Sequence, residues 1–179
     1  MRARLFTDGG ARLNPGLAGI GVVLLDDRGE VIGEIARPIG TATNNVAEYT
    51  ALIEGLKLAL QKGVTHVDIQ VDSPVVAGHL LETYKVKSAR LRVLIDEVNA
   101  LLERFDNHSL RREPRAENAR ADRLANAGMD ASTASMFTVH LDLPGESVSA
   151  TCARCLEQSP TSPIPEDLAG ASHWVWVLI

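Results

Sequence analysis

Hydrophobic positions recur every three or four residues in one stretch of the chain, TNNVAEYTALIEGLKLALQK, residues 43–62. The apolar side chains of this stretch are Tyr49, Leu52, Ile53, Leu56, Ala59 and Leu60. This period is typical of an amphipathic helix that turns one face to a core. Thr43 or Asn44 can serve as N-cap, because a side-chain oxygen there accepts a hydrogen bond from a free backbone N–H. Gly63 follows at the C′ position, where helices commonly end.

Shorter runs of alternating or β-branched apolar residues predict five strands, at residues 5–7, 19–26, 31–38, 67–71 and 109–113. Further helical periodicity predicts three more helices, at residues 73–82, 88–105 and 118–129. Three strands, a helix and another strand form the order of a mixed sheet with a right-handed crossover. The sequence therefore predicts an α/β fold for residues 1–130.

The character of the chain changes at Ala131, and residues 131–179 form a predicted C-terminal extension that is β-rich or irregular. Its segments are linker-like (131–135), alternating as in a strand (137–143), rich in proline and serine (159–165) and again strand-like (173–179). We therefore predict two parts, a body of residues 1–130 and an acidic extension whose role the sequence leaves open.

Length and composition indicate a globular protein. A chain of 179 residues with 45% hydrophobic and 23% charged residues suits one domain with an appendage. No apolar run approaches the roughly 20 residues of a membrane helix, and the first residues, MRARLFTDGG, lack the apolar core of a secretory signal. Two cysteines three residues apart make no disulfide framework. We expect a cytoplasmic protein without membrane association.

The net charge of −5 is unevenly distributed. Residues 1–130 hold 17 Lys and Arg against 18 Asp and Glu, whereas residues 131–179 hold 1 against 5. The acidity lies mostly in the extension, and the nearly neutral body can still present a basic face. Charge therefore does not exclude a nucleic-acid substrate.

Four acids occupy positions from which they could meet. Asp8 and Asp72 end predicted strands, and ligands of open α/β sheets gather at the carboxyl ends of strands. Glu48 and Asp122 lie near helix starts. Taken singly, Glu48 suits the positive end of a helix dipole, and an aspartate after a strand is commonly a cap. If the two strands are parallel neighbours, all four carboxylates converge on one edge of the sheet.

Converging carboxylates repel one another and raise one another's pKa unless a cation neutralises them. Oxygen ligands of this kind select Mg²⁺ or Mn²⁺ rather than zinc. Such a cluster suits two-metal phosphodiester hydrolysis, in which one ion activates a water and a second, about 4 Å away, stabilises the leaving oxygen.

The ordered motifs of residues 1–130 closely resemble type 1 ribonuclease H. They are Phe6-Thr-Asp-Gly-Gly, Asn14-Pro-Gly, Thr43-Asn-Asn-Val-Ala-Glu-Tyr, Val71-Asp-Ser, Tyr84-Lys-Val-Lys and Glu117-Asn-Ala-Arg-Ala-Asp-Arg-Leu-Ala-Asn. Each motif alone is weak evidence, but the set in this order and spacing is highly specific.

The resemblance implies the ribonuclease H fold, a five-stranded mixed sheet flanked by helices, and hydrolysis of the RNA strand of RNA–DNA hybrids to 3′-hydroxyl and 5′-phosphate ends. It implies two Mg²⁺ or Mn²⁺ ions, and it assigns catalysis and metal binding to Asp8, Glu48, Asp72 and Asp122. It implies no obligate protein partner. The substrate-binding candidates are Asn14, Asn44 and Asn45 in the minor groove, and Lys85, Lys87, Arg12 and Arg115 on phosphates. Groove contacts fit a hybrid, because 2′-hydroxyls distinguish RNA from DNA; turn or cap chemistry and solvated lysines are the alternatives.

Two residues depart from the family pattern. Arg112 stands ten residues before Asp122, where members often carry a histidine, and arginine cannot shuttle a proton at neutral pH. Pro74 removes a side-chain hydrogen bond to the groove. Two alternative functions follow: a hybrid-binding module with weak or lost catalysis, and a nuclease of the same fold with another substrate, such as a 3′ exonuclease. The Asn-Asn and Lys-Val-Lys elements speak against the exonuclease.

The extension holds a Cys-x-x-Cys pair, Cys152 and Cys155, between His140 and His173. A structural zinc site needs four ligands, and these histidine spacings match no zinc pattern. We therefore interpret the cysteines as reduced thiols. Trp174 and Trp176 are interpreted as packing residues rather than base-stacking ones.

Overall fold

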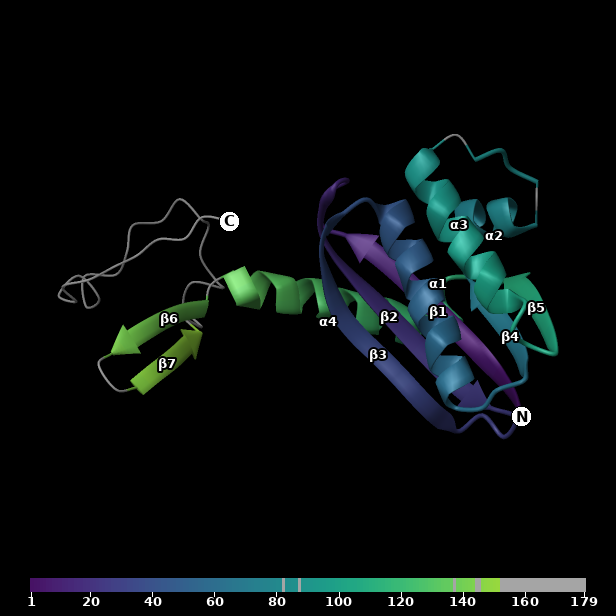
Figure 1. The fold of residues 1–179 in the computed structure, drawn as a ribbon, viewed down its shortest axis with the longest axis horizontal. Coiled ribbons are helices and arrows are strands. Elements are labelled where there is room, and N and C mark those ends of the chain that lie inside the picture. The colour runs from purple at the N-terminus through teal and green to yellow at the C-terminus, as the bar shows by residue number, and fades with distance from the viewer. Residues whose placement is uncertain (82, 87, 137, 144–145, 152–179) are drawn as a thin grey trace. The chain divides into compact units, whose positions relative to one another are not determined.

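The computed structural model describes residues 1–81, 83–86, 88–136, 138–143 and 146–151 (Figure 1). The chain divides into two compact units, Met1–Met136 and Phe137–Ile179. The first unit contains one sheet with its helices, and the second contains a two-stranded sheet. Among the described residues, no helix combines the length and the apolar character needed to cross a membrane.

The first unit is built on a five-stranded mixed sheet in the order β3-β2-β1-β4-β5. Its strands are β1 (Arg2–Ala11), β2 (Gly16–Asp26), β3 (Val31–Ala42), β4 (His66–Val71) and β5 (Asn107–Arg112). The first three strands pair antiparallel, whereas β4 lies parallel between β1 and β5. The predicted mixed sheet is therefore confirmed, and β1 and β4 meet the condition for Asp8 and Asp72 to come together, because they are parallel neighbours.

Four helices complete this unit: α1 (Asn44–Gln61), α2 (Pro74–Leu80), α3 (Ala89–Leu102) and α4 (Ala119–Met136). The first three begin after a hydroxyl residue, Thr43, Ser73 or Ser88, whose side chain accepts a hydrogen bond from the N–H three residues later. Thr43 is thus the N-cap of α1, and Gly63 follows its end with φ of +73°. The predicted helix at residues 43–62 is confirmed.

The main core lies between the sheet and helices α1 and α3. Tyr49, Leu52 and Leu56 of α1 are fully buried, and they pack in one cluster with inward-facing residues of β1, β2 and β4. Helix α4 packs against β1, β2 and β3. It comes so close that a Cβ on Gly21 would lie 2.0 Å from the Ala121 carbonyl oxygen, and Gly19 meets the Met129 nitrogen in the same way at 2.4 Å. Figure 1 shows α1 and α4 crossing the first three strands.

Three predicted boundaries were wrong by four residues or more. Strand β1 runs to Ala11, so Asp8 lies within a strand rather than at its end. Strand β3 continues past Pro38, which is tolerated because β3 is an edge strand and its register with β2 shifts beside Pro38. Helix α4 continues through residues 131–135, predicted to be a linker, because that segment contains neither glycine nor proline to stop it.

In the second unit, β6 (Thr138–Leu143) pairs antiparallel with β7 (Glu146–Thr151). The predicted strand around residues 137–143 is confirmed, and β7 was not predicted. His140 lies in β6. The predictions for residues 159–165 and 173–179, and those for Cys152, Cys155, His173, Trp174 and Trp176, fall outside the described residues.

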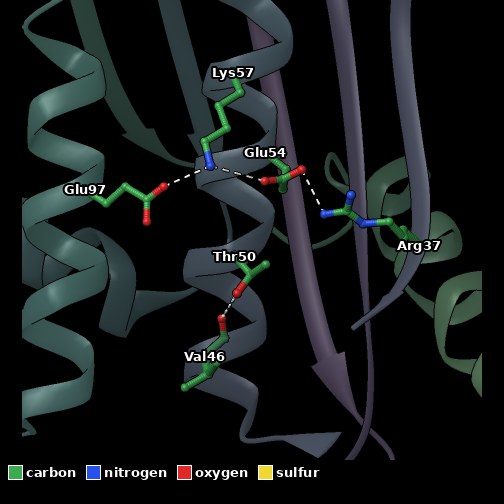
Figure 2. A network of polar contacts seen from close by, with 6 residues as sticks. All are labelled: Arg37, Val46, Thr50, Glu54, Lys57 and Glu97. Carbon is green, nitrogen blue, oxygen red and sulfur yellow. Dashed lines mark hydrogen bonds and ion pairs between the residues drawn. The ribbon is translucent and has the colours of Figure 1, made fainter. Parts of the chain in front are cut away.

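A chain of ion pairs joins β3, α1 and α3 on the surface (Figure 2). Glu54 accepts a hydrogen bond from Arg37 at 2.8 Å and lies 3.5 Å from the Lys57 ammonium, which in turn lies 2.9 Å from Glu97. Below them in α1, the Thr50 hydroxyl donates to the Val46 carbonyl oxygen at 2.7 Å. The Arg37, Lys57 and Glu97 side chains are 42–51% exposed, so water and salt screen these pairs.

We expect Glu54→Gln to lower the free energy of unfolding by no more than about 1 kcal/mol, because exposed ion pairs contribute little. Urea unfolding at low and high salt measures this loss, and high salt should remove most of it. Glu103→Gln is the matched control, since Glu103 makes no ion pair within the described part of the chain. A loss above about 2 kcal/mol that persists in salt would show that packing, not charge, is involved.

Candidate active site

Three carboxylates meet beside the parallel strands β1 and β4. Asp8 comes from β1, Glu48 from the first turns of α1, and Asp72 directly follows β4. One carboxylate oxygen of each lies within 4.8 Å of those of the other two. All three residues are partly buried. Three hard oxygen ligands at this spacing fit a divalent cation such as Mg²⁺ or Mn²⁺.

Gly9 lets α1 bring Glu48 to this place. A Cβ on Gly9 would lie 2.2 Å from the Ala47 carbonyl carbon and 2.5 Å from the Glu48 nitrogen, distances that real Cβ atoms do not show. Only glycine permits β1 and α1 to approach so closely. The Gly9 backbone and the buried Ser73 hydroxyl also hydrogen-bond the Glu48 carboxylate. The sequence showed Gly9 only as part of a motif, and did not indicate this contact.

Burial and mutual repulsion raise the pKa values of two of these acids. Desolvation is the largest cause at Glu48, followed by the charges of Asp8 and Asp72, and its pKa rises to about 9. Desolvation also leads at Asp8, followed by the charges of Asp72 and Asp122, and its pKa rises to about 6. Without a cation, Glu48 therefore holds a proton at neutral pH, and a bound cation would displace it.

The raised pKa of Glu48 makes the stability of the metal-free protein depend on pH. Glu48 is ordinarily an acid of pKa 4.5, so between about pH 4.5 and 9 the folded protein holds a proton that the unfolded chain releases. Its contribution to stability is fully present below pH 4.5 and is lost as the pH rises towards 9. We expect Glu48→Gln to be more stable than wild type by several kcal/mol at pH 8, because each pH unit above 4.5 adds about 1.4 kcal/mol, and nearly equal to it at pH 4.5.

Urea unfolding in EDTA at several pH values measures this difference. Mg²⁺ should reverse it, because the ion stabilises the folded wild type and binds the variant more weakly. A difference between the two proteins that does not change with pH would contradict the assignment of the raised pKa to Glu48.

Asp122 lies in the first turn of α4 and is not one of the three clustered acids. Its Oδ1 accepts a hydrogen bond from Arg115 at 2.6 Å, and its Oδ2 accepts one from Asn126 at 3.2 Å. Its charge nevertheless raises the pKa of Asp8, and the Arg115 guanidinium acts on Asp8 in the opposite direction. The structure thus places Asp122 and Arg115 together beside the cluster. The predicted contact of Arg115 with phosphate stays a prediction.

Asn118 ties β1 to α4 next to these acids. Its side chain is 1% exposed, and its Nδ2 donates to the Thr7 carbonyl oxygen at 2.9 Å. The backbone carbonyl oxygen of Asn118 accepts from the Asp122 N–H at 3.1 Å, as in a helical turn. Asn118 therefore links the residue before Asp8 to Asp122. This role was not predicted from the sequence, because an asparagine at a helix start ordinarily indicates a cap.

The asparagines predicted for the minor groove lie at the start of α1 and in the loop before β2. Asn44 Oδ1 accepts from the Ala11 N–H at 2.8 Å, and Asn14 Oδ1 accepts from the Asn44 N–H at 3.1 Å. These bonds brace the loop against α1, so the cap-and-turn reading applies to both residues. Asn45 is exposed in the first turn of α1. All three remain groove candidates.

The predicted phosphate contacts are more scattered. Arg12 forms an ion pair with Asp130 of α4. Lys85 is exposed, and Lys87 falls outside the described residues. Arg112, at the position of the usual histidine, ends β5 opposite Val71, the residue that precedes Asp72 in the chain. Pro74 is the first residue of α2, after the Ser73 cap.

Comparisons with known proteins agree with this architecture. The family described as reverse transcriptase-like matches residues 6–128. The ribonuclease H1 of Halobacterium salinarum is similar with a TM-score of 0.72 and 38% identity, over 73% of this chain and 99% of that chain. LC11 ribonuclease H1, isolated from compost and solved with an RNA/DNA hybrid, has a TM-score of 0.69 and 39% identity over 73% and 99%.

The chain belongs to the type 1 ribonuclease H family. The predicted family and the predicted ribonuclease H fold are thereby confirmed. A bifunctional protein of Mycobacterium tuberculosis is 40% identical over 164 residues, which are 91% of this chain and 43% of that protein. This chain thus spans less than half the length of that family member.

Proposed function

We propose that this chain is an endoribonuclease that hydrolyses the RNA strand of RNA–DNA hybrids and depends on Mg²⁺ or Mn²⁺. The observation that carries the proposal is the group of Asp8, Glu48 and Asp72, with their oxygens within 4.8 Å of one another. Membership of the ribonuclease H family, and a relative of 39% identity solved with an RNA/DNA hybrid, support the choice of substrate.

Each acid has its own part in holding the cation. Asp8 and Asp72 approach from adjacent parallel strands, and Glu48 approaches from α1, so the cation is held from two elements of the sheet and one helix. Asp122, beside the cluster, is the fourth ligand of the proposal, and it must exchange its bond to Arg115 for the cation. When bound, the ions supply an activated water and neutralise the leaving oxygen.

The groove and phosphate contacts of the proposal come from residues of the family's motifs. Asn14, Asn44 and Asn45 offer amide groups that can bond 2′-hydroxyls and base edges of a wide, shallow groove. Lys85 is exposed and offers its ammonium to the phosphate backbone. We place the protein in the cytoplasm as part of the proposal.

The test is to incubate the purified chain with a strand-labelled RNA–DNA hybrid in Mg²⁺, Mn²⁺ or EDTA, with duplex RNA and duplex DNA as controls. The proposal expects metal-dependent cleavage of the hybrid's RNA strand alone, with 5′-phosphate and 3′-hydroxyl ends. Tight hybrid binding without cleavage in either metal would overturn it in favour of a binding module. Cleavage of duplex DNA or trimming from 3′ ends would favour a different nuclease of this fold.

A further inference from the structure

Three aromatic rings in successive contact, here called the ladder, link helix α1 to the loop that carries Lys85. They belong to Tyr49, His79 and Tyr84. Tyr49 is fully buried in α1, and its hydroxyl is 2.9 Å from His79 Nδ1, with the two rings stacked at 6.2 Å. His79 also contacts the Tyr84 ring, which stands at 84° to it with centroids 6.3 Å apart. Tyr49 directly follows Glu48, so the ladder begins next to a clustered acid.

The loop at residues 83–86, here called the basic loop, is also fastened to the backbone of α2. The Gly78 carbonyl oxygen accepts from the Thr83 N–H at 2.8 Å, the Tyr84 N–H at 2.9 Å and the Thr83 hydroxyl at 3.0 Å. A Cβ on Gly78 would lie 2.4 Å from the Tyr84 ring, so the ring rests directly on the helix backbone. At the other end, Arg92 of α3 donates twice to the Val86 carbonyl oxygen, at 3.1 and 3.3 Å.

These contacts hold an exposed segment in one conformation. Lys85 lies between the two fastened points, is exposed, and has no ion pair within the described residues. Ordering an exposed loop costs conformational entropy, about 1–2 kcal/mol for each residue of backbone. A lysine held in advance loses less freedom when it binds a phosphate than one on a free loop.

We propose that His79 is a positioning residue for the phosphodiester backbone of the substrate. It fixes the Tyr84 ring, and through that ring it fixes Lys85. Lys85 is thereby held in place relative to the clustered acids, one of which, Glu48, directly precedes Tyr49. The inference rests on the proposed function for the identity of the substrate. His79 does not touch the reacting atoms in this assignment, so it acts on KM rather than on kcat.

A double-mutant cycle on the full chain tests this coupling. KM and kcat for hybrid cleavage are measured for wild type, His79→Ala, Lys85→Ala and the double variant. We expect each single variant to raise KM about fivefold with kcat within about twofold, and the double variant to be little worse than either, because coupled residues are not additive. Effects on KM that multiply would overturn the inference, and so would a Lys85→Ala protein with unchanged KM.

Tyr84 provides a second route if His79→Ala is unfolded at the assay temperature. Tyr84 is 52% exposed, so Tyr84→Ala leaves the core intact, and it should give the same non-additive pattern with Lys85→Ala. Tyr84→Phe is the matched control and should behave as wild type, because the contact is made by the ring. Multiplying effects of Tyr84→Ala and Lys85→Ala would overturn the inference as well.

Failure of the proposed function and failure of the positioning role of His79 give different results. A wild-type chain that binds the hybrid without cutting it refutes the nuclease, and the same variants then report on His79 through the Kd for the hybrid. Coupling in Kd would support the positioning role, and additive changes in Kd would refute it.

Discussion

Asp72→Asn should abolish cleavage of the RNA strand while the affinity for the hybrid stays close to that of wild type. Asn cannot supply the negative charge that holds a divalent cation, and Asp72 is one of three clustered ligands. Loss of that ligand should lower kcat by ~10³-fold or more, because the ions supply both the activated water and the neutralised leaving oxygen. Single-turnover cleavage and a separate measurement of Kd distinguish the loss of chemistry from a loss of binding.

Asp68→Asn is the matched control for this prediction. Asp68 lies in β4, four residues before Asp72, where it accepts hydrogen bonds from Arg2 at 2.7 Å and Ser109 at 2.6 Å. Within the described residues it belongs to no cluster of acids that could hold a metal ion, so the same chemical change should leave kcat within about twofold. An Asp72→Asn protein that cuts at the wild-type rate would show that Asp72 is not a ligand.

Much of this arrangement could be predicted because its signals are local. The apolar period, the Thr43 cap and the Gly63 stop together define α1, and this helix brings Glu48 to its place. The apolar strand before Asp72 ends where predicted, at Val71. Parallel pairing of the strands that carry Asp8 and Asp72 then follows from a right-handed crossover through α1.

The remaining features depend on contacts between residues far apart in the chain. The bond from Asn118 to the Thr7 carbonyl oxygen spans 111 residues, and no local pattern indicates it. The pairing of Asp122 with Arg115 involves neighbours in sequence, but an arginine in a loop has many possible partners, and the choice follows from the fold. The continuation of α4 through residues 131–135 was not predicted, because alanine, serine and threonine are compatible with both helix and loop.

Gly9→Ala should destabilise the protein and impair catalysis together. The new Cβ would lie 2.2 Å from the Ala47 carbonyl carbon and 2.3 Å from its oxygen, and these are backbone atoms that no side-chain rotation can move. Overpacking of flexible side chains commonly costs 1–3 kcal/mol, so a clash with backbone should cost about 3 kcal/mol or more. For a chain of this length we expect a fall in Tm of roughly 6–12 °C.

The Gly9→Ala substitution should also lower the rate of cleavage, because relief of the clash moves α1 away from β1 and carries Glu48 with it. A shift of about 1 Å in a catalytic ligand can cost on the order of 10²-fold in rate, so kcat should fall even at temperatures where the variant is folded. Gly10→Ala is the neighbouring control: its Cβ would meet only the Met129 side chain, at 3.4 Å, and Tm and kcat should stay near wild type. If Gly9→Ala kept wild-type Tm and kcat, the close approach of α1 to β1 could not be what positions Glu48. If it lost stability but kept kcat, Glu48 would have to reach the cation independently of that approach.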